Sequence, residues 1–202
     1  MPRDPLSRHF MTMACNNAWA NHRLLRACEQ LTQAEFAAIR VSFFPSIKAT
    51  LNHNLTVDWF YVDALEREAR GDESHPDVAT FFKPAEPCGN CRQLGEEQRA
   101  VDRRLMAYCA ALTDAGLGRV VTILRPRGIQ HDTRTRLLAH LFQHQIHHRG
   151  QAHAMLAGTT VKPPQLDDFF CAGDAPLRAG DLAALGLSEA AIWGPQADAV
   201  SG

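Results

Sequence analysis

Apolar residues recur at steps of three and four positions over four long segments of the chain, which is the pattern of amphipathic helices. The first segment covers about 6–31, and the second begins after Pro45 and extends to about 70. The third covers about 94–112 and the fourth about 133–158. We therefore expect a mainly helical protein with four long helices.

The segments between these helices carry turn and strand signals. Residues 32–36 have the sequence pattern of a capping box and predict the start of a short turn. Residues 71–95 are rich in Gly, Pro, Asp and Ser and predict a long loop, a type of segment that is often functional or mobile. Residues 118–130 contain β-forming side chains interrupted by Pro126 and Gly128, which favours a short hairpin or an extended crossover before the last helix.

The end of the chain has a different composition. Pro163 and Pro164 stop any helix, and the residues that follow are rich in Ala, Gly and Pro, with one short helix expected at 188–193. We expect the main helical domain over 1–170. Residues 171–202 are then a C-terminal extension that packs on this domain or is partly disordered.

Composition limits the class of protein. A chain of 202 residues can bury a sufficient core as one domain without disulfides or a metal. The net charge of −1 provides no basic field for nucleic acid, so we expect no nucleic-acid partner. The sequence has neither a signal-peptide pattern nor an apolar run of membrane-spanning length, so we expect no membrane partner and a cytoplasmic location. Its six irregularly spaced cysteines should be reduced there.

Histidine is the unusual residue of this chain, because four of its ten histidines lie between positions 140 and 148. His144 and His148 are four residues apart, so they lie about one turn apart on the same helix face and can bind one ion. His140 and His144 form a competing pair, and His147 lies beside the same face. Gln151 lies on the same side of the helix as these histidines and could bind a metal-bound water. No Glu follows His144, so the metalloprotease signature is absent.

A third ligand would have to come from another helix. His53 shares a helix face with four residues that could be buried, so its imidazole should point inward; these residues are Thr50, Val57, Phe60 and Ala64. In a helical bundle, one histidine that faces a pair of histidines on another helix could complete a set of three ligands for one metal ion. A single histidine on an apolar face is, however, more often a hydrogen-bonded core residue than a ligand.

Several separate segments, in this order and at these distances, resemble the DinB family over about residues 8–170. They are Asn16–Asn21, Phe43–Ile47, Thr50–His53 with Asp58 and Trp59, His144–Gln151 and Pro163–Asp167. The resemblance implies an all-α fold, a four-helix bundle with up-up-down-down topology, with the short extended hairpin before the last helix. It also implies a three-histidine metal site whose ligands are His53, His144 and His148.

Relatives in this superfamily include S-transferases and isomerases that use the thiols bacillithiol or mycothiol. The resemblance thus implies a metal-dependent enzyme that activates a thiol or water, as an S-transferase or hydrolase does, with a small-molecule substrate or a low-molecular-weight thiol as partner. His147, Gln151 and His140 are candidates for orienting groups or shuttling protons. Zinc or nickel suits the three imidazoles, and iron, copper or manganese is also compatible.

Two alternatives belong to other functional classes. The chain could be a non-catalytic metal-binding stress-response protein, or an interaction module that dimerises through its helix faces and carries the histidines as polar core residues. We expect a homodimer whether the protein is an enzyme or an interaction module. Elemental analysis distinguishes the interaction module, which would hold no stoichiometric metal.

Other polar and aromatic residues are expected to be structural. Cys88 and Cys91 have the spacing of a redox or zinc half-site, but a single such pair is more often loop structure. Asp58 lies about 140° from His53 around the helix, so a structural pair with a basic residue is expected rather than a metal role. Arg149 lies on the far side of its helix and should form a structural ion pair or cap. The aromatic residues Trp19, Trp59, Phe60 and Tyr61 are expected in the core.

Overall fold

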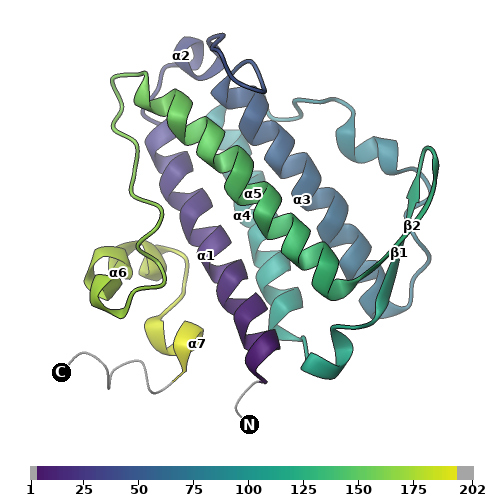
Figure 1. Ribbon diagram of the computed structural model, residues 1–202. Coiled ribbons are helices and arrows are strands. Elements are labelled where there is room, and N and C mark those ends of the chain that lie inside the picture. Colours follow the sequence, from purple (N-terminus) through teal and green to yellow (C-terminus); the bar gives the residue numbers. More distant parts are fainter. Residues whose placement is uncertain (1–3, 195–202) are drawn as a thin grey trace.

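Four long helices dominate the computed structural model, which describes residues 4–194 (Figure 1). They are α1 (Pro5–Cys28), α3 (Ile47–Arg70), α4 (Cys91–Ala110) and α5 (Arg134–Ala157). The shorter elements are α2 (Gln33–Ala37), α6 (Ala175–Ala184), α7 (Glu189–Trp193), three 3-10 turns (Val78–Phe82, Asp114–Gly116 and Ala172–Asp174) and the strands β1 (Val120–Arg125) and β2 (Gly128–Thr133). The four long helices, which we call the four-helix core, confirm the expected mainly helical fold.

Polar caps explain where the long helices begin. The side chains of Ser46, Asn90 and Thr133 each accept a hydrogen bond from a main-chain N–H group in the first turn of α3, α4 and α5. The capping box at Thr32 is confirmed at the start of α2. Helix α3 ends at Gly71, whose φ of 77° is a left-handed conformation that favours glycine. Local sequence therefore sets the ends of these helices.

The directions of the long helices correct one expectation. In Figure 1, α1 runs up, α3 and α4 run down and α5 runs up, so the expected up-up-down-down order is wrong. Arg134, at the start of α5, bonds Glu68 near the end of α3, while Asn52 in the second turn of α3 bonds Cys88 just before α4. The physical reason lies in the connections. Residues 29–46 turn back at one end of the core, whereas residues 71–90 cross its length of about 36 Å.

The core forms where the apolar faces of the four long helices meet. Its fully buried side chains include Leu24, Leu55, Leu105 and Leu138, one from each helix. The predicted core aromatics Trp19, Phe60 and Tyr61 are buried, and Trp59 is half-buried. These helices supply the rigid frame on which the histidines are held.

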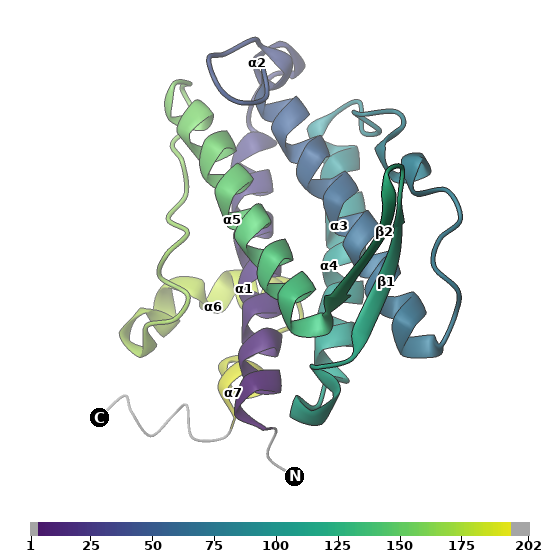
Figure 2. The same ribbon diagram turned by 45° about the vertical axis from the view of Figure 1, so that its right-hand side comes forward.

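The predicted strand region is an antiparallel hairpin that leads into α5. Strand β1 pairs with β2 from Val120 opposite Thr133 to Arg125 opposite Gly128. The hairpin extends beyond the four-helix core at the side where the 71–90 loop passes, as Figure 2 shows. That loop packs Phe81 and Phe82 on Phe60 of α3. The structure thus confirms the hairpin rather than the extended crossover. The loop predicted at 71–95 ends earlier, because Asn90 caps α4.

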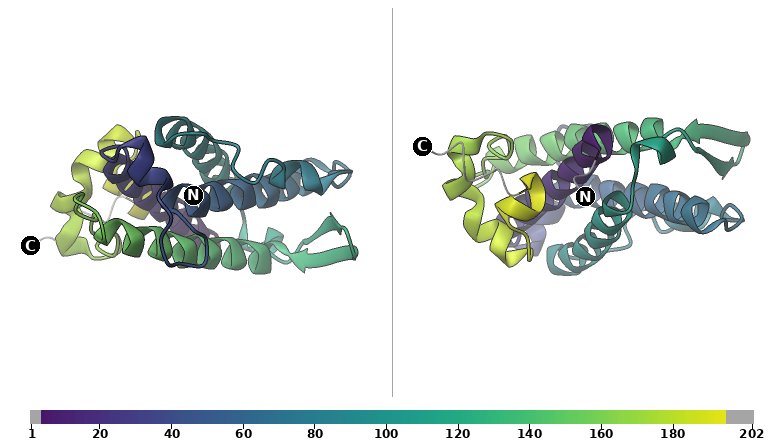
Figure 3. Two further views of the ribbon diagram at one scale, coloured as in Figure 1. Left: turned by 90° about the horizontal axis from the view of Figure 1, so that it is seen from above. Right: turned by 90° about the horizontal axis from the view of Figure 1, so that it is seen from below.

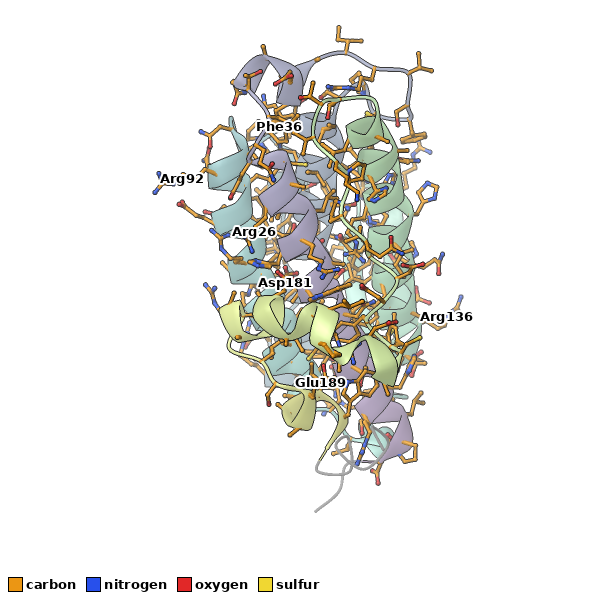
Figure 4. The ribbon with its side chains drawn as sticks, turned by 90° about the vertical axis from the view of Figure 1, so that its left-hand side faces the viewer. Arg26, Phe36, Arg92, Arg136, Asp181 and Glu189 are labelled. Carbon is orange, nitrogen blue, oxygen red and sulfur yellow. The ribbon has the colours of Figure 1, made fainter. Side chains whose placement is uncertain are left out.

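Residues 172–194 lie along the outer face of α1, on the side of the four-helix core opposite the hairpin (Figure 3). Figure 4 shows α6 crossing this face, with Arg26 of α1 beside Asp181 of α6. A second apolar cluster holds the segment in place: Cys15, Trp19, Ala20, Phe169, Leu182 and Ile192. Helix α6 was not predicted, because its Ala-rich sequence hides the apolar period. Of the expected extension, 195–202 lie outside the described residues, and the division at residue 170 stays a prediction.

No disulfide joins any of the six cysteines, all of which lie in the described part of the chain. Burial raises the pKa of the Cys88 thiol to about 11 and that of the Cys91 thiol to about 12. Such thiols stay protonated near neutral pH and are poor nucleophiles. The structural interpretation of this pair therefore fits its surroundings. Within residues 4–194, none of the helices combines the length and apolar character needed to cross a membrane.

Candidate metal centre

His53 of α3 and the pair His144 and His148 of α5 come together in the structure. One ring nitrogen from each lies within 4.8 Å of the other two, and the Nε2 atoms of His53 and His144 are 3.0 Å apart. The three ring centroids are separated by 4.5 to 4.9 Å. Among residues 4–194, no other set of three or more metal-ligating side chains lies this close. The sequence-predicted trio is thus a spatial cluster.

The helix geometry explains the cluster. Helices α3 and α5 pack side by side and antiparallel, so the second turn of α3 lies beside the middle of α5. The two α5 histidines are one turn apart on one face, and His53 faces them from α3. The other candidate pair does not form the cluster: His140 lies one turn earlier, its ring 6.1 Å from that of His144 and 5.3 Å from that of Tyr61.

The donor set fits a divalent ion. Nitrogens bound to zinc at 2.0 to 2.1 Å in a tetrahedral arrangement lie about 3.3 Å from one another. The observed separations, from 3.0 Å to 4.8 Å, bracket this value, so small side-chain movements would suffice. Three imidazoles leave at least one coordination position for another ligand, as in catalytic rather than structural zinc sites.

Electrostatics also favour neutral imidazoles. Burial, followed by the charge that His148 would carry, lowers the pKa of His53 to about 4. Burial and the neighbouring histidines lower the pKa of His144 to about 3. Burial lowers the pKa of His148 as well, against the opposing effect of its bond to Gln151. All three rings are therefore neutral near pH 7 and keep the lone pairs that a metal needs.

Gln151 connects His148 to His147. The Nδ1 atom of His148 lies 2.8 Å from Gln151 Oε1, and Gln151 Nε2 lies 3.0 Å from His147 Nε2. The carbonyl oxygen of an amide only accepts, so His148 donates from Nδ1 and keeps its Nε2 lone pair for the centre. His147 is exposed. Two of the residues predicted as orienting groups therefore contact the trio directly or through one hydrogen bond.

Two aromatic side chains form a wall beside the histidines, and sequence reasoning did not assign them this position. The Phe44 ring lies 4.4 Å from that of His53 and 5.4 Å from that of His148. The Phe43 ring lies 5.9 Å from that of His148 yet is 75% exposed. The sequence feature that could have indicated this position is the pair of consecutive aromatic residues directly before Pro45, in the segment Phe43–Ile47. An apolar ligand portion could pack on this wall.

Asp58 and Arg149 point into the four-helix core and away from the histidines. Asp58 is buried, but its hydrogen-bond partner is Gln98, at 2.7 Å, so the expected pairing with a basic residue is wrong. Helix packing places an α4 amide against this carboxyl. Burial raises the pKa of the carboxyl, and the Arg149 charge opposes this rise without a hydrogen bond between them. Arg149 is buried and has a structural role, but in place of the expected ion pair or cap it donates to the neutral side-chain oxygens of Asn17 and Asn21.

Comparison with known proteins agrees with this geometry. The model of the DinB family matches residues 6–173. The chain belongs to the DinB family. No curated protein matches it significantly. Its fold is similar to the crystal structure of a DinB-like protein from Bacillus cereus, with a TM-score of 0.58 and 15% sequence identity, covering 77% of this chain and 94% of that one.

The DinB match ends at residue 173, directly before α6. The whole histidine centre and the Phe43 and Phe44 wall lie inside the matched region of this DinB protein. Helices α6 and α7 lie beyond it and contact α1, on the far side of the four-helix core from the hairpin. The candidate centre is therefore a feature of the family domain.

Proposed function

We propose that this DinB protein is a metal-dependent enzyme that activates a thiol or water for attack on a small-molecule electrophile. The observation that supports the proposal is the convergence of three neutral imidazoles, from His53, His144 and His148, beside a partly exposed aromatic wall. A purely structural histidine cluster would not need an open side. An S-transferase type of reaction, with a low-molecular-weight thiol, is the form that we favour, and a hydrolase type is the second.

The three histidines would hold the ion. When bound, a divalent metal acts as a Lewis acid and lowers the pKa of a thiol or water. Zinc or nickel suits three imidazole ligands, and iron, copper and manganese also accept nitrogen donors. We propose zinc or nickel as the physiological ion.

The surrounding residues would orient the ligands and carry protons. Gln151 accepts the Nδ1 proton of His148 and so fixes the direction in which this ring presents Nε2. His147 is exposed, and its ring centroid lies 4.8 Å from that of His148, which suits exchange of protons with solvent. His140, which is also exposed, is the second candidate for this role.

Phe44 would exclude water from one side of the centre, because its ring contacts two of the three histidines. Phe43 would contact an apolar part of the substrate at the entrance. We further propose a cytoplasmic protein that forms a homodimer. The exposed apolar side chains of Ile39 and Val41 support an interaction surface on the loop that also contributes the wall.

The decisive experiment adds thiols to the cobalt-substituted protein. If a thiol enters the open position, a thiolate-to-metal charge-transfer band should appear in the near ultraviolet and the visible cobalt bands should change. A small electrophile should then be consumed with turnover. A fully loaded site that no low-molecular-weight thiol perturbs would exclude the S-transferase reaction and leave the hydrolase reaction to be tested with ester substrates. Metal binding without any turnover would favour the non-catalytic alternative.

A further inference from the structure

Each of the three histidines is followed in the sequence by a residue that is buried in the four-helix core. Asn54 follows His53, Gln145 follows His144 and Arg149 follows His148. Successive residues on a helix lie about 100° apart, so a histidine that faces the centre directs its successor toward the core. The same three turns of helix thus carry both the proposed ligands and a set of buried polar groups.

The buried polar groups connect α5 to two neighbouring helices. Gln145 Nε2 donates to the main-chain oxygen of Asn54 on α3, at 3.1 Å. The Arg149 guanidinium donates to the side-chain oxygens of Asn17 and Asn21 on α1, at 2.6 and 2.9 Å. These bonds attach α5 directly beside both of its histidines.

The connections then continue around the four-helix core. Asn17 and Asn21 of α1 each donate to Asp102 of α4, at 3.1 Å. Gln98 of α4 donates to Asp102 at 3.2 Å and to Asp58 of α3 at 2.7 Å. We call this set, with Gln145, Arg149 and the Asn54 main chain, the buried polar ring. It links all four long helices.

Stability alone does not account for the buried polar ring. Buried charged groups often stabilise a protein no more than apolar side chains of the same volume would, because they lose their hydration. Directional hydrogen bonds can fix the rotation and axial position of packed helices, whereas apolar contacts permit more slippage. The α5 members of the ring, Gln145 and Arg149, directly follow His144 and His148, so slippage of α5 at these positions would move both histidines.

A small rotation would be enough to separate the proposed ligands. A side-chain tip lies about 5 to 6 Å from the helix axis, so turning α5 by roughly 20° moves it about 2 Å. Metal–ligand distances tolerate deviations of only about 0.2 Å. Side-chain rotation can absorb part of such a movement, but His148 is already fixed by Gln151.

We propose that Gln145 and Arg149 are positioning residues for the histidine centre, and that they act by fixing the rotation of α5 relative to α3 and α1. This inference rests on the proposed metal-binding function. Neither residue would contact the metal or the substrate. Their effect would pass through the helix backbone to His144 and His148.

The test measures cobalt affinity by competition with a chelator, together with the visible spectrum of the bound cobalt and thermal unfolding by circular dichroism. The variants are Gln145→Leu, Arg149→Met and the conservative Arg149→Lys. We expect the first two to bind cobalt at least tenfold more weakly and with an altered spectrum, in the range typical for removing groups that orient metal ligands. Arg149→Lys, which keeps a cationic donor, should recover part of both properties.

The matched control is Arg178→Met. Arg178 is also a buried arginine, but it bonds Glu189 and the main-chain oxygens of Asp168 and Cys171, and none of these bonds reaches the histidine centre. Its removal should lower the unfolding temperature and leave cobalt affinity and spectrum unchanged.

The outcomes separate the two proposals. A wild-type protein that binds no cobalt would overturn the proposed function itself. Wild-type binding, with Gln145→Leu and Arg149→Met folded and unchanged in affinity and spectrum, would overturn only the positioning role. Failure of both variants to fold would assign the buried polar ring to folding and would also overturn the positioning role.

Discussion

The Nε2 atoms of His53 and His144 lie 3.0 Å apart across the interface of α3 and α5. Two neutral imidazoles at this distance can form a hydrogen bond only if one Nε2 carries the proton and the other accepts it. A metal ion replaces that proton and uses both lone pairs. The contact that joins the two helices is thus also the place where metal and proton would compete.

Metal binding should depend on all three histidines. Removing one imidazole from a three-nitrogen centre leaves two ligands, so His53→Ala, His144→Ala and His148→Ala should each lower metal content sharply, as measured by elemental analysis after dialysis. His140→Ala is the control and should retain metal, because its ring lies outside the cluster. A stoichiometric metal content in His144→Ala would refute the ligand assignment.

The protein should remain folded without metal. The four-helix core buries apolar side chains from every long helix and does not need the ion to form. The metal-free form and His144→Ala should therefore keep the helical circular dichroism of the loaded protein. Loss of helical signal on chelation would contradict this expectation.

Proton competition should begin only at acidic pH. Burial lowers the pKa of His53 to about 4 and that of His144 to about 3, compared with 6.5 for an unperturbed imidazole. A ligand histidine competes with protons below its own pKa, so zinc affinity should change little between pH 8 and 6.5 and fall steeply below about pH 5. Chelator competition at several pH values measures it. A tenfold loss between pH 7.5 and 6.5 would show that these rings are more basic than the structure indicates.

The C-terminal segment should stabilise the protein without contributing to the centre. Leu182 of α6 is buried against the cluster that contains Trp19 and Phe169. Leu182→Ala should cost about 2 to 4 kcal/mol, by loss of buried area and creation of a cavity. Urea unfolding measures the change, and metal content should stay at the wild-type value. A Leu182→Ala protein of normal stability but reduced metal content would connect this segment to the centre instead.

Much of the fold could be predicted because it is determined by local sequence patterns. The three- and four-residue apolar steps located the four long helices, and Pro126 and Gly128 indicated the hairpin. The spacing of His144 and His148 indicated a pair, but spacing alone could not exclude His140. The family resemblance made that choice, and the structure brings the same three histidines together.

The remaining features depend on tertiary packing. Helix direction follows from where the connections cross, which apolar periodicity does not encode. Phe44 reaches the histidines only because of the path of the loop before α3. Asp58 and Gln98 are polar residues on separate helices, and nothing in the local pattern shows that they meet in the core.

Asp58 should make the stability of the protein depend on pH. Burial, with the nearby Asp102 carboxylate, raises the pKa of Asp58 to about 8, compared with 3.8 in an unfolded chain. Between these values the folded protein binds one more proton than the unfolded protein, so this contribution to stability is complete below pH 3.8 and is lost as pH rises through 8. The histidines whose pKa is lowered by burial, His22, His53, His144 and His148, have the opposite sign, and because their unfolded pKa is 6.5 each still adds up to about 0.4 kcal/mol between pH 6.5 and 8.

In the wild-type protein these opposing contributions largely cancel between pH 6.5 and 8, so the Asp58 contribution is obtained by comparing the wild type with Asp58→Asn. Asp102 changes little in this interval, because burial raises its pKa only to about 6. Across this interval the contribution of Asp58 to the free energy of unfolding of the wild-type protein should fall by about 1.5 kcal/mol. Asp58→Asn, which keeps a neutral group of the same shape, should lack this fall, so between the two pH values its free energy of unfolding in urea should rise by about 1.5 kcal/mol relative to that of the wild type. Asp63→Asn is the control on the same helix, since its carboxylate pairs with Arg67 at the surface, and it should retain the wild-type slope. An Asp58→Asn protein with the same pH dependence of stability as the wild type would show that Asp58 is ionised in the folded state at neutral pH.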